Sequence, residues 1–257
     1  MTVLPRVIPT VAEWRELRAA HRAAGRTVGF VPTMGALHDG HLALMRAARR
    51  ANDVVLVSIF VNPTQFDEAQ DYEKYPRTPD SDLALLDAAG VDAVFAPTFA
   101  EIYPDGTRYS VQESDHSREL EGAHRPGHFT GVLTVVMKLL QIAEAERAYF
   151  GEKDFQQLEL VRGMAAAFFL PTEIVGCPIV READGLAMSS RNARLSPAER
   201  ALAPQFHSAL AGAPTAEAAR AQLAAAGFAV DYVEDRDGRR FGAVRLGSVR
   251  LIDNVAL

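Results

Sequence analysis

The sequence predicts an α/β protein in which a doubly wound, Rossmann-like parallel sheet domain is followed by a smaller C-terminal α+β domain. Short apolar runs, such as residues 54–61, have the length and composition of strands buried on both faces. These runs alternate with helix-length segments, which is the order expected when crossover helices join parallel strands. After about Pro178 the alternation stops, and helices are followed by short strands. We therefore expect domains at residues 1–178 and 179–257.

The first domain begins with a capping box, Thr10 to Glu13, that predicts a helix ending near Ala24, before Gly25. Strands are then expected at 27–31, 54–61, 91–95, 148–150 and 172–175, and helices at 41–52, 79–89, 131–142 and 154–168. In the second domain Ser196 and Glu199 form another capping box, and a helix is expected at 215–226 with strands at 229–234 and 249–252. Ligands of such a fold bind at the carboxyl ends of the parallel strands.

Composition excludes several classes of partner. The 27 basic and 33 acidic residues give a net charge of −6, which argues against nucleic acid or an anionic membrane as the main partner. Cys177 is the only cysteine and has apolar neighbours, so it predicts a buried structural thiol and a reducing compartment. No signal peptide or membrane-length apolar run is visible, so we expect a soluble, cytoplasmic protein.

The strongest motif is residues 30–41, Phe-Val-Pro-Thr-Met-Gly-Ala-Leu-His-Asp-Gly-His, where a predicted strand turns into a helix. Amides at a helix N-terminus and the helix dipole favour an anion such as phosphate. His38 and His41 in this position are biased toward the neutral imidazole, which can donate a hydrogen bond to a phosphoryl oxygen. The alternative is that both histidines are solvated side chains in an ordinary turn.

Two further segments favour phosphate binding less strongly. Residues 186–192, Leu-Ala-Met-Ser-Ser-Arg-Asn, bring hydroxyls and a guanidinium together, but Ser-Ser-Arg is common in surface loops, and taken alone the segment favours such a loop. In residues 149–157, Asp154 and Gln157 have the spacing of a helix-capping pair, which is the structural alternative there. Lys153 stands out because the chain has only three lysines against 24 arginines. Its ammonium is a compact charge suited to phosphate oxygens.

A fourth segment, residues 58–66, follows the predicted strand 54–61 and contains Asn62-Pro63, which is typical of a turn. Gln65 lies at the carboxyl end of this strand. Its side-chain amide can bind a carboxylate or hydroxyls. Taken alone, the segment favours a binding role and a plain turn equally.

Taken together, these motifs resemble the pantothenate synthetase family of the HxGH nucleotidyl-transferase superfamily. The resemblance rests on Pro-Thr-Met-Gly-Ala-Leu-His-Asp-Gly-His, Phe-Val-Asn-Pro-x-Gln-Phe, Tyr-Pro-Arg-Thr, Arg-Pro-Gly-His-Phe-x-Gly-Val, Phe-Gly-Glu-Lys-Asp-Phe-Gln-Gln-Leu and Ser-Ser-Arg-Asn, in that order. It covers about residues 27–195, with a last match at 250–254. Thr64 replaces a methionine usual in the family, and the part after Phe206 is shorter than usual.

The resemblance implies the site residues. It implies ATP contacts at Met34, Gly35, Ala36, Leu37, His38, Asp39, Gly40, His41, Gly151, Glu152, Lys153, Asp154, Val180, Met188, Ser189, Ser190 and Arg191. Among these, His38, His41, Lys153 and Arg191 are the expected catalytic residues. Gln65 and Gln157 match the pair that holds pantoate, and Gln65 also lies near the β-alanine site. Arg125 and His128 match a stretch close to the pocket and receive no role.

The implied activity is the ATP-dependent condensation of pantoate with β-alanine to pantothenate, through a pantoyl adenylate. Mg²⁺ is expected on the phosphates, with no protein metal ligands assigned, and the second domain is expected to close as a lid. A homodimer is expected because family members are commonly dimers. The alternatives are another adenylyltransferase of the superfamily and a non-catalytic adenylate-binding module.

Overall fold

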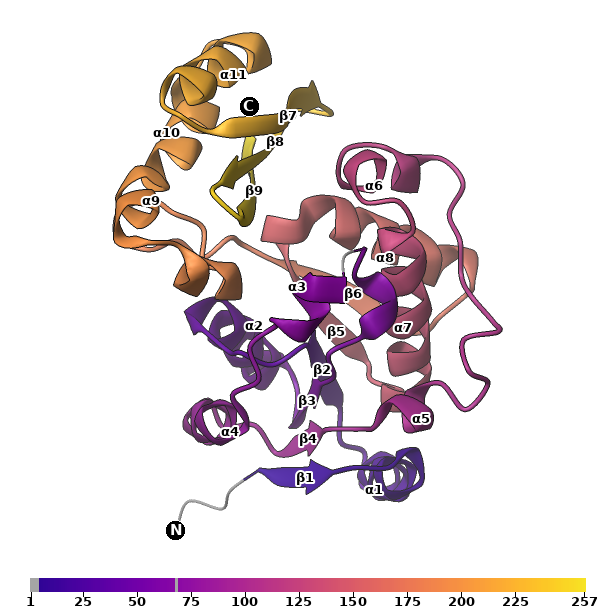
Figure 1. Cartoon of the computed structure of the whole chain (residues 1–257). Coiled ribbons are helices and arrows are strands. Elements are labelled where there is room, and N and C mark those ends of the chain that lie inside the picture. The colour runs from indigo at the N-terminus through magenta and orange to yellow at the C-terminus, as the bar shows by residue number, and fades with distance from the viewer. Residues whose placement is uncertain (1–4, 68) are drawn as a thin grey trace. The chain divides into compact units, whose positions relative to one another are not determined.

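The computed structural model describes residues 5–67 and 69–257. Contacts divide the chain into two compact units, each described by itself below. The first contains the described residues up to Gly151 together with Gln156–Cys177, and the second contains Glu152–Phe155 and Pro178–Leu257. The short segment Glu152–Phe155 thus groups with the C-terminal part of the chain, whereas the sequence placed it in the first domain. Both units can be followed by colour in Figure 1.

The first unit is built on a six-stranded sheet in the order β1-β4-β3-β2-β5-β6, with every pair parallel. The strands are β1 Arg6–Ile8, β2 Val28–Thr33, β3 Val54–Ile59, β4 Ala93–Phe95, β5 Arg147–Gly151 and β6 Glu173–Cys177. The predicted fold class is confirmed. The edge strand β1 was not predicted, because only one of its three residues, Ile8, is buried and no apolar run marks it.

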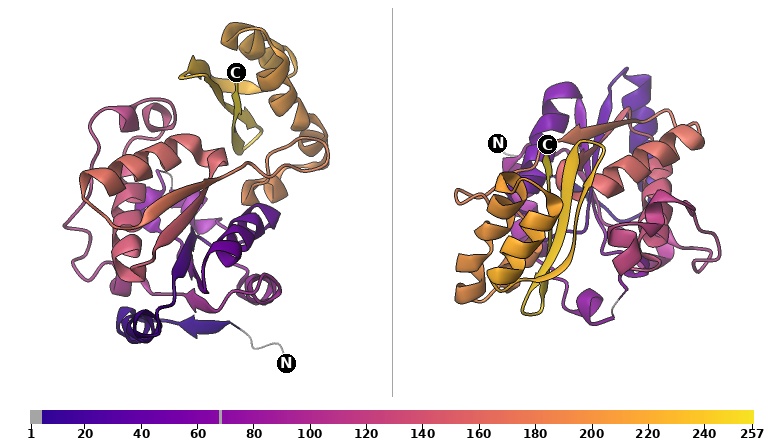
Figure 2. Two further views of the ribbon diagram at one scale, coloured as in Figure 1. Left: turned by 180° about the vertical axis from the view of Figure 1, so that it is seen from behind. Right: turned by 90° about the horizontal axis from the view of Figure 1, so that it is seen from above.

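Helices cover both faces of this sheet, as Figures 1 and 2 show. Helices α2 Asp39–Ala51 and α4 Pro79–Ala88 lie on one face, and α1 Val11–Ala23, α7 His128–Ala143 and α8 Phe155–Ala167 lie on the other. This arrangement follows from right-handed crossovers, because the chain runs from β2 to β4 in one direction and from β5 to β6 in the other. The remaining short helices are α3 Ala69–Glu73, α5 Phe99–Ile102, α6 Glu121–His124, and the 3-10 helices η1 Pro63–Gln65 and η2 His116–Arg118.

Capping explains where the observed helices depart from prediction. Helix α2 starts at Asp39 rather than His41 because the His38 side chain accepts a hydrogen bond from the Gly40 amide. At α1 the Thr10 hydroxyl accepts from the Glu13 amide, but the Glu13 carboxylate binds Arg6 at 2.7 Å instead of completing the capping box.

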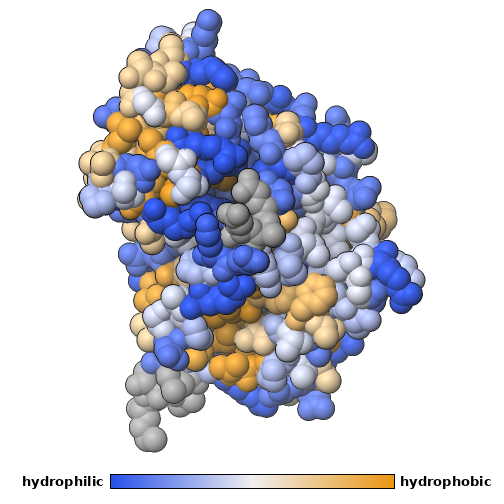
Figure 3. Space-filling model, viewed as in Figure 1, coloured by the Kyte–Doolittle hydropathy of each residue, from blue (hydrophilic) through white to orange (hydrophobic). Residues whose placement is uncertain are grey.

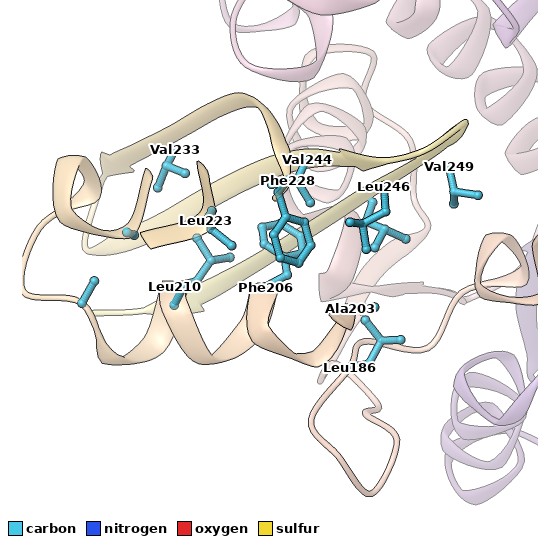
Figure 4. Close-up of a cluster of buried hydrophobic side chains, with 14 residues drawn as sticks. Leu186, Ala203, Phe206, Leu210, Leu223, Phe228, Val233, Val244, Leu246 and Val249 are labelled. Atoms are coloured by element: carbon cyan, nitrogen blue, oxygen red, sulfur yellow. The ribbon is translucent and has the colours of Figure 1, made fainter. Parts of the chain in front are cut away.

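The second unit packs helices against a three-stranded antiparallel sheet, β7-β8-β9. Its strands are β7 Ala229–Arg236, β8 Arg239–Leu246 and β9 Val249–Ala256, and its helices are η3 Glu152–Asp154, η4 Ser190–Arg194, α9 Pro197–Leu202, α10 Pro204–Gly212 and α11 Ala216–Ala225. Phe206, Leu210 and Phe228 lie in its apolar core (Figure 4). The capping box predicted at Ser196 is present. Strand β8 was missed, although Asp237-Gly238, with positive φ angles of 49° and 72°, is a typical two-residue hairpin turn.

The surface mixes polar and apolar residues. On the face drawn in Figure 3, hydrophobic groups are separated by hydrophilic side chains. Within the described part of the chain, no helix combines the length and the apolar composition needed to cross a membrane. Cys177 is buried at the end of β6, as its apolar neighbours predict.

Candidate active site

The first unit has its topological switch point between β2 and β5. From β2 the chain proceeds through β3 to β4 on one side, whereas β5 pairs with β2 on the other side and leads to β6. Ligands of open parallel sheets bind outside the carboxyl ends of the strands at such a point. Strand β2 ends at Thr33, directly before the His-x-Gly-His turn, and β5 ends at Gly151. The two longest predicted motifs therefore both leave the sheet at its switch point.

His38 and His41 form a reciprocal cap at the start of α2. The His38 Nδ1 accepts from the Gly40 amide at 3.2 Å, and the His41 Nδ1 accepts from the His38 amide at 3.4 Å. The ring centroids lie 4.1 Å apart. Since Nδ1 is an acceptor in both rings, this hydrogen-bond pattern assigns the proton of each neutral imidazole to Nε2. The two histidines are therefore fixed by the turn instead of being loose solvated side chains.

Asp82, in the first turn of helix α4, binds the main chain just before the two histidines. Its carboxylate is 2% exposed and accepts from the Ala36 amide at 3.0 Å and the Leu37 amide at 2.8 Å. Ala36 has a φ of 50° and Gly35 a φ of 79°, a left-handed pair that needs such an external acceptor to hold it. The amides of Ala36 and Leu37 therefore already have an acceptor within the protein.

Gln65 lies beside this turn. Its Nε2 is 3.2 Å from the sulfur of Met34, and its Oε1 accepts from the Asn62 amide group at 3.2 Å. The first unit therefore brings together two residues to which the resemblance assigns different ligands, ATP for Met34 and pantoate for Gln65. Asn62 is 1% exposed and lies next to the proline that starts η1, so the Asn-Pro turn has a positioning role as well.

The main chain of Gln65 is held by the segment that received no role from sequence. Its carbonyl lies 2.8 Å from the His128 Nδ1 and accepts from the Arg125 guanidinium at 3.3 Å. Arg125 also pairs with Asp67 at 2.9 Å. Burial opposes ionisation of Asp67, but the charge and hydrogen bond of Arg125 outweigh it and lower the pKa of this carboxyl. His128 and Arg125 thus fix the backbone from which the Gln65 side chain projects.

Helix α7 contacts the same backbone at a glycine. A Cβ built on Gly131 would lie 2.2 Å from the carbonyl oxygen of Thr64 and 2.7 Å from the nitrogen of Gln65. No side chain fits there without moving the backbone of η1. Thr64 itself, the residue that departs from the family pattern, donates to Asn62 Oδ1 at 3.0 Å and lies 3.2 Å from the Tyr103 hydroxyl.

The adjacent glutamines at the start of α8 differ in use. Gln156 is 4% exposed, and its side-chain amide binds the main chain of His116, Glu119 and Glu121. Gln157 is half-buried, and no hydrogen bond joins its side chain to another residue within 5–67 and 69–257. The pantoate-binding role that the resemblance implies for Gln157 stays a prediction.

In the second unit, a hairpin brings several predicted ATP-binding residues together. The Met188 amide donates to the Val180 carbonyl at 3.0 Å, and Arg181 pairs with Ala187. Ser189 then caps η4, because its hydroxyl accepts from the Arg191 amide at 3.2 Å. The Asn192 side chain anchors this loop through the Ala187 carbonyl at 3.0 Å.

Lys153 lies in η3, which comes before α8. Asp154 makes an ion pair of 3.9 Å with Lys153, and α8 begins at the next residue, Phe155. In the described residues no group of three or more His, Cys, Asp or Glu side chains could hold a metal ion.

A family model for pantoate-beta-alanine ligase matches residues 6–256. The chain belongs to the pantoate-beta-alanine ligase family. The pantothenate synthetase of Bdellovibrio bacteriovorus is 57% identical over 242 residues, which cover 94% of this chain and 96% of that protein. The pantothenate synthetase of Mycobacterium bovis is 55% identical over 264 residues, covering 94% and 85%.

Two crystal structures from this ligase family share the fold. The enzyme of Francisella tularensis, complexed with "Beta-gamma ATP and Beta-alanine", superimposes with a TM-score of 0.93 at 39% identity, covering 98% of this chain and 97% of that one. The pantothenate synthetase of Thermus thermophilus gives 0.88 at 46% identity, covering 98% and 99%. The sequence-based assignment to the family is confirmed.

Sequence reasoning missed several residues that hold predicted site residues in place within each unit. Asp82 looks like an ordinary acidic residue in the first turn of a helix, and nothing in its spacing predicts a partner 45 residues earlier. Tyr103, which donates to Asn62 Oδ1 at 2.9 Å, likewise has no local signal. Asn254 lies within the last family match, residues 250–254, so a signal for it was present.

Proposed function

We propose that this chain condenses pantoate with β-alanine, using ATP and releasing AMP and pyrophosphate. The observation that supports the proposal is the contact of Gln65 with Met34, because the resemblance assigns an acid to the first residue and a nucleotide to the second. A site that only bound a nucleotide would not need this neighbour. Family membership over nearly the whole chain supports the same substrates.

The chemistry requires two displacements. A carboxylate does not condense with an amine in water, because its oxygen is a poor leaving group. In the first step a pantoate carboxylate oxygen attacks the α-phosphorus of ATP, and the bond to the bridging oxygen of pyrophosphate breaks. In the second, the neutral amine of β-alanine attacks the acyl carbon, AMP leaves with the former carboxylate oxygen, and the nitrogen loses a proton. The protein need only position the groups and stabilise charge.

The imidazoles are the main donors of the turn. With Nδ1 of each ring accepting a backbone amide, the Nε2–H of His38 and of His41 is the group that donates to phosphoryl oxygens as pyrophosphate departs. The rigid cap keeps both donors in place before the nucleotide arrives, so little reorganisation is needed during the reaction. Gly35 and Gly40 let the backbone approach the nucleotide closely.

The second unit supplies the remaining charge. Lys153 and Arg191, with the hydroxyls of Ser189 and Ser190, neutralise the phosphates, and Val180 and Met188 contact the nucleotide. Mg²⁺ would be held by the phosphates of the nucleotide, where it would neutralise part of their charge. Closure of the C-terminal domain, residues 179–257, shields the adenylate from water.

Gln65 and Gln157 hold pantoate through their side-chain amides, and Gln65 adjoins the β-alanine site. The protein works in the cytoplasm as a homodimer. The negative charge of −6 fits small-molecule substrates better than nucleic acid or a membrane.

The test is a pyrophosphate-release assay with ATP and pantoate, before and after β-alanine is added. His41→Ala should lower the adenylation rate by about 10² or more, the scale of losing one transition-state donor. Gln65→Ala should weaken pantoate far more than ATP, and equal effects on both would refute its assignment. An adenylyltransferase that stops after the first step would form no amide product, and a binding module would release no pyrophosphate.

A further inference from the structure

Lys153 is held in place by a residue a hundred positions further along the chain. Asn254, on β9, is 2% exposed. Its Nδ2 donates to the carbonyl of Glu152 at 2.9 Å and to the carbonyl of Lys153 at 3.0 Å. The three residues all belong to the second unit. A single buried amide group thus binds both carbonyls of the turn that presents the Lys153 ammonium.

The orientation of this amide is fixed from its other side. The Arg239 guanidinium donates to Asn254 Oδ1 at 2.6 Å, so the oxygen faces Arg239 and the two N–H donors face the turn. Arg239 also stacks on Phe155, with its Cζ 4.0 Å from the ring centroid, and Phe155 follows directly after η3. The turn is therefore gripped at its two carbonyls and at the aromatic ring that comes after it.

Strand β9 also holds the other phosphate-binding loop of this unit. Asp253, 4% exposed, accepts two hydrogen bonds from Arg181, at 2.7 and 3.0 Å. Arg181 lies in the hairpin that joins Val180 to Met188. Strand β9 packs against both η3 and η4. Neighbouring residues of one strand thus position two segments that the family resemblance assigns to ATP.

We infer that Asn254 is a positioning residue for the adenylation step, which sets the place of the Lys153 ammonium by binding the carbonyls of Glu152 and Lys153. The inference rests on the proposed role of Lys153. A main-chain shift at this turn moves the base of the lysine side chain and with it the charge. Misplacement of a reacting or charge-stabilising group by about 1 Å can cost about 10²-fold in rate.

The decisive variant is Asn254→Asp, which keeps the size of the side chain but replaces the two N–H donors with a carboxylate oxygen facing two carbonyls. We expect kcat/KM for ATP, measured by pyrophosphate release with saturating pantoate, to fall about tenfold or more. Lys153→Ala and the double variant complete a mutant cycle. If Asn254 acts through Lys153, Asn254→Asp should lower the rate less than twofold in the Lys153→Ala background.

Equal fold losses from Asn254→Asp in the two backgrounds would overturn the inference, since they would mean that Asn254 acts independently of the lysine. Full activity of Lys153→Ala would instead refute the proposed role of Lys153. If Lys153→Ala loses activity while Asn254→Asp keeps it, the role of Asn254 is refuted and that of Lys153 stands. If Asn254→Asp does not fold, Arg239→Met serves as the second variant, because Arg239 is less buried. It should lower kcat/KM for ATP in the same direction, but by less.

Arg240→Lys is the matched control. Arg240 neighbours Arg239 on β8, is 1% exposed, and binds the carbonyls of Leu210 and Ala213 at 3.1 and 2.6 Å. It should lower the thermal midpoint without changing kcat/KM for ATP at a temperature where it is fully folded. A comparable kinetic loss in Arg240→Lys would show that any weakening of this sheet impairs adenylation and would overturn the specific role of Asn254.

Discussion

Adding one methyl group to Gly131 tests the proposed substrate-binding role of Gln65 and how tightly its side-chain amide is positioned. The Cβ of Gly131→Ala would lie 2.2 Å from the Thr64 carbonyl oxygen, whereas ordinary contacts begin at 3.4 Å. The backbone of η1 must therefore retreat from α7 by about 1 Å, a displacement that costs about 10²-fold when it moves a substrate-positioning group. Overpacking of this kind should also lower the free energy of unfolding by about 1–3 kcal/mol.

The assay is pantoate-dependent pyrophosphate release at varied pantoate and varied ATP, with urea unfolding on the same samples. We expect kcat/KM for pantoate to fall by about 10², through a higher KM, a lower kcat or both, while KM for ATP changes much less. The control is Gly163→Ala in α8, where a Cβ would meet nothing within 4 Å. That variant should keep full activity and gain about 0.5–1 kcal/mol of stability from helix propensity.

Two results would refute this reasoning. Normal pantoate kinetics in Gly131→Ala would mean that η1 tolerates the shift without disturbing Gln65. Equal losses toward pantoate and ATP would point to general damage to the first unit instead of a displaced amide.

Two further predictions concern buried and paired carboxylates. Asp82→Ala leaves the amides of Ala36 and Leu37 without their acceptor, so the free energy of unfolding in urea should fall by about 2 kcal/mol or more. KM for ATP should rise more than KM for pantoate. Asp82→Asn keeps one acceptor oxygen and should lose less stability. A hydrogen bond from Lys138 lowers the pKa of Asp105 from 3.8 to about 2. Because the folded-state pKa is the lower one, this stabilisation is complete above pH 3.8 and is lost as the pH falls toward 2. Across that pH range the free energy of unfolding should fall less steeply in Lys138→Met than in the unaltered protein. An identical pH dependence in both proteins would contradict the assignment.

Local sequence patterns predicted most of the first unit. Its central strands β2 and β3 are apolar runs, and its first helix begins at the Thr10 cap, so the alternation of strands and helices can be inferred from residues close together in sequence. The strands that were not predicted either lack such patterns or mix apolar with charged residues. Strand β1 is too short, and β8 carries Arg239 and Arg240 in succession, one binding Asn254 and the other buried against helix α10.

The candidate site divides in the same way. The histidines, Lys153 and the glutamines stand in motifs whose chemistry can be inferred from residue type and from their place at strand ends. Asp82 and Asn254 act through partners 45 and about a hundred positions away, and such pairings depend on tertiary structure alone. Arg125 and His128 were noticed, but their role became clear only when the structure placed both at the carbonyl of Gln65.

The dependence of the histidine turn on Asp82 limits how the motif can be transplanted. A peptide or grafted loop spanning residues 27–52 would contain every residue of the turn and its helix, yet it would lack the acceptor for two main-chain N–H groups. In a foreign scaffold those groups would turn to water, and the left-handed bend at Gly35 and Ala36 would relax. Transferring this histidine turn to another protein therefore requires moving a carboxylate on a separate helix along with it.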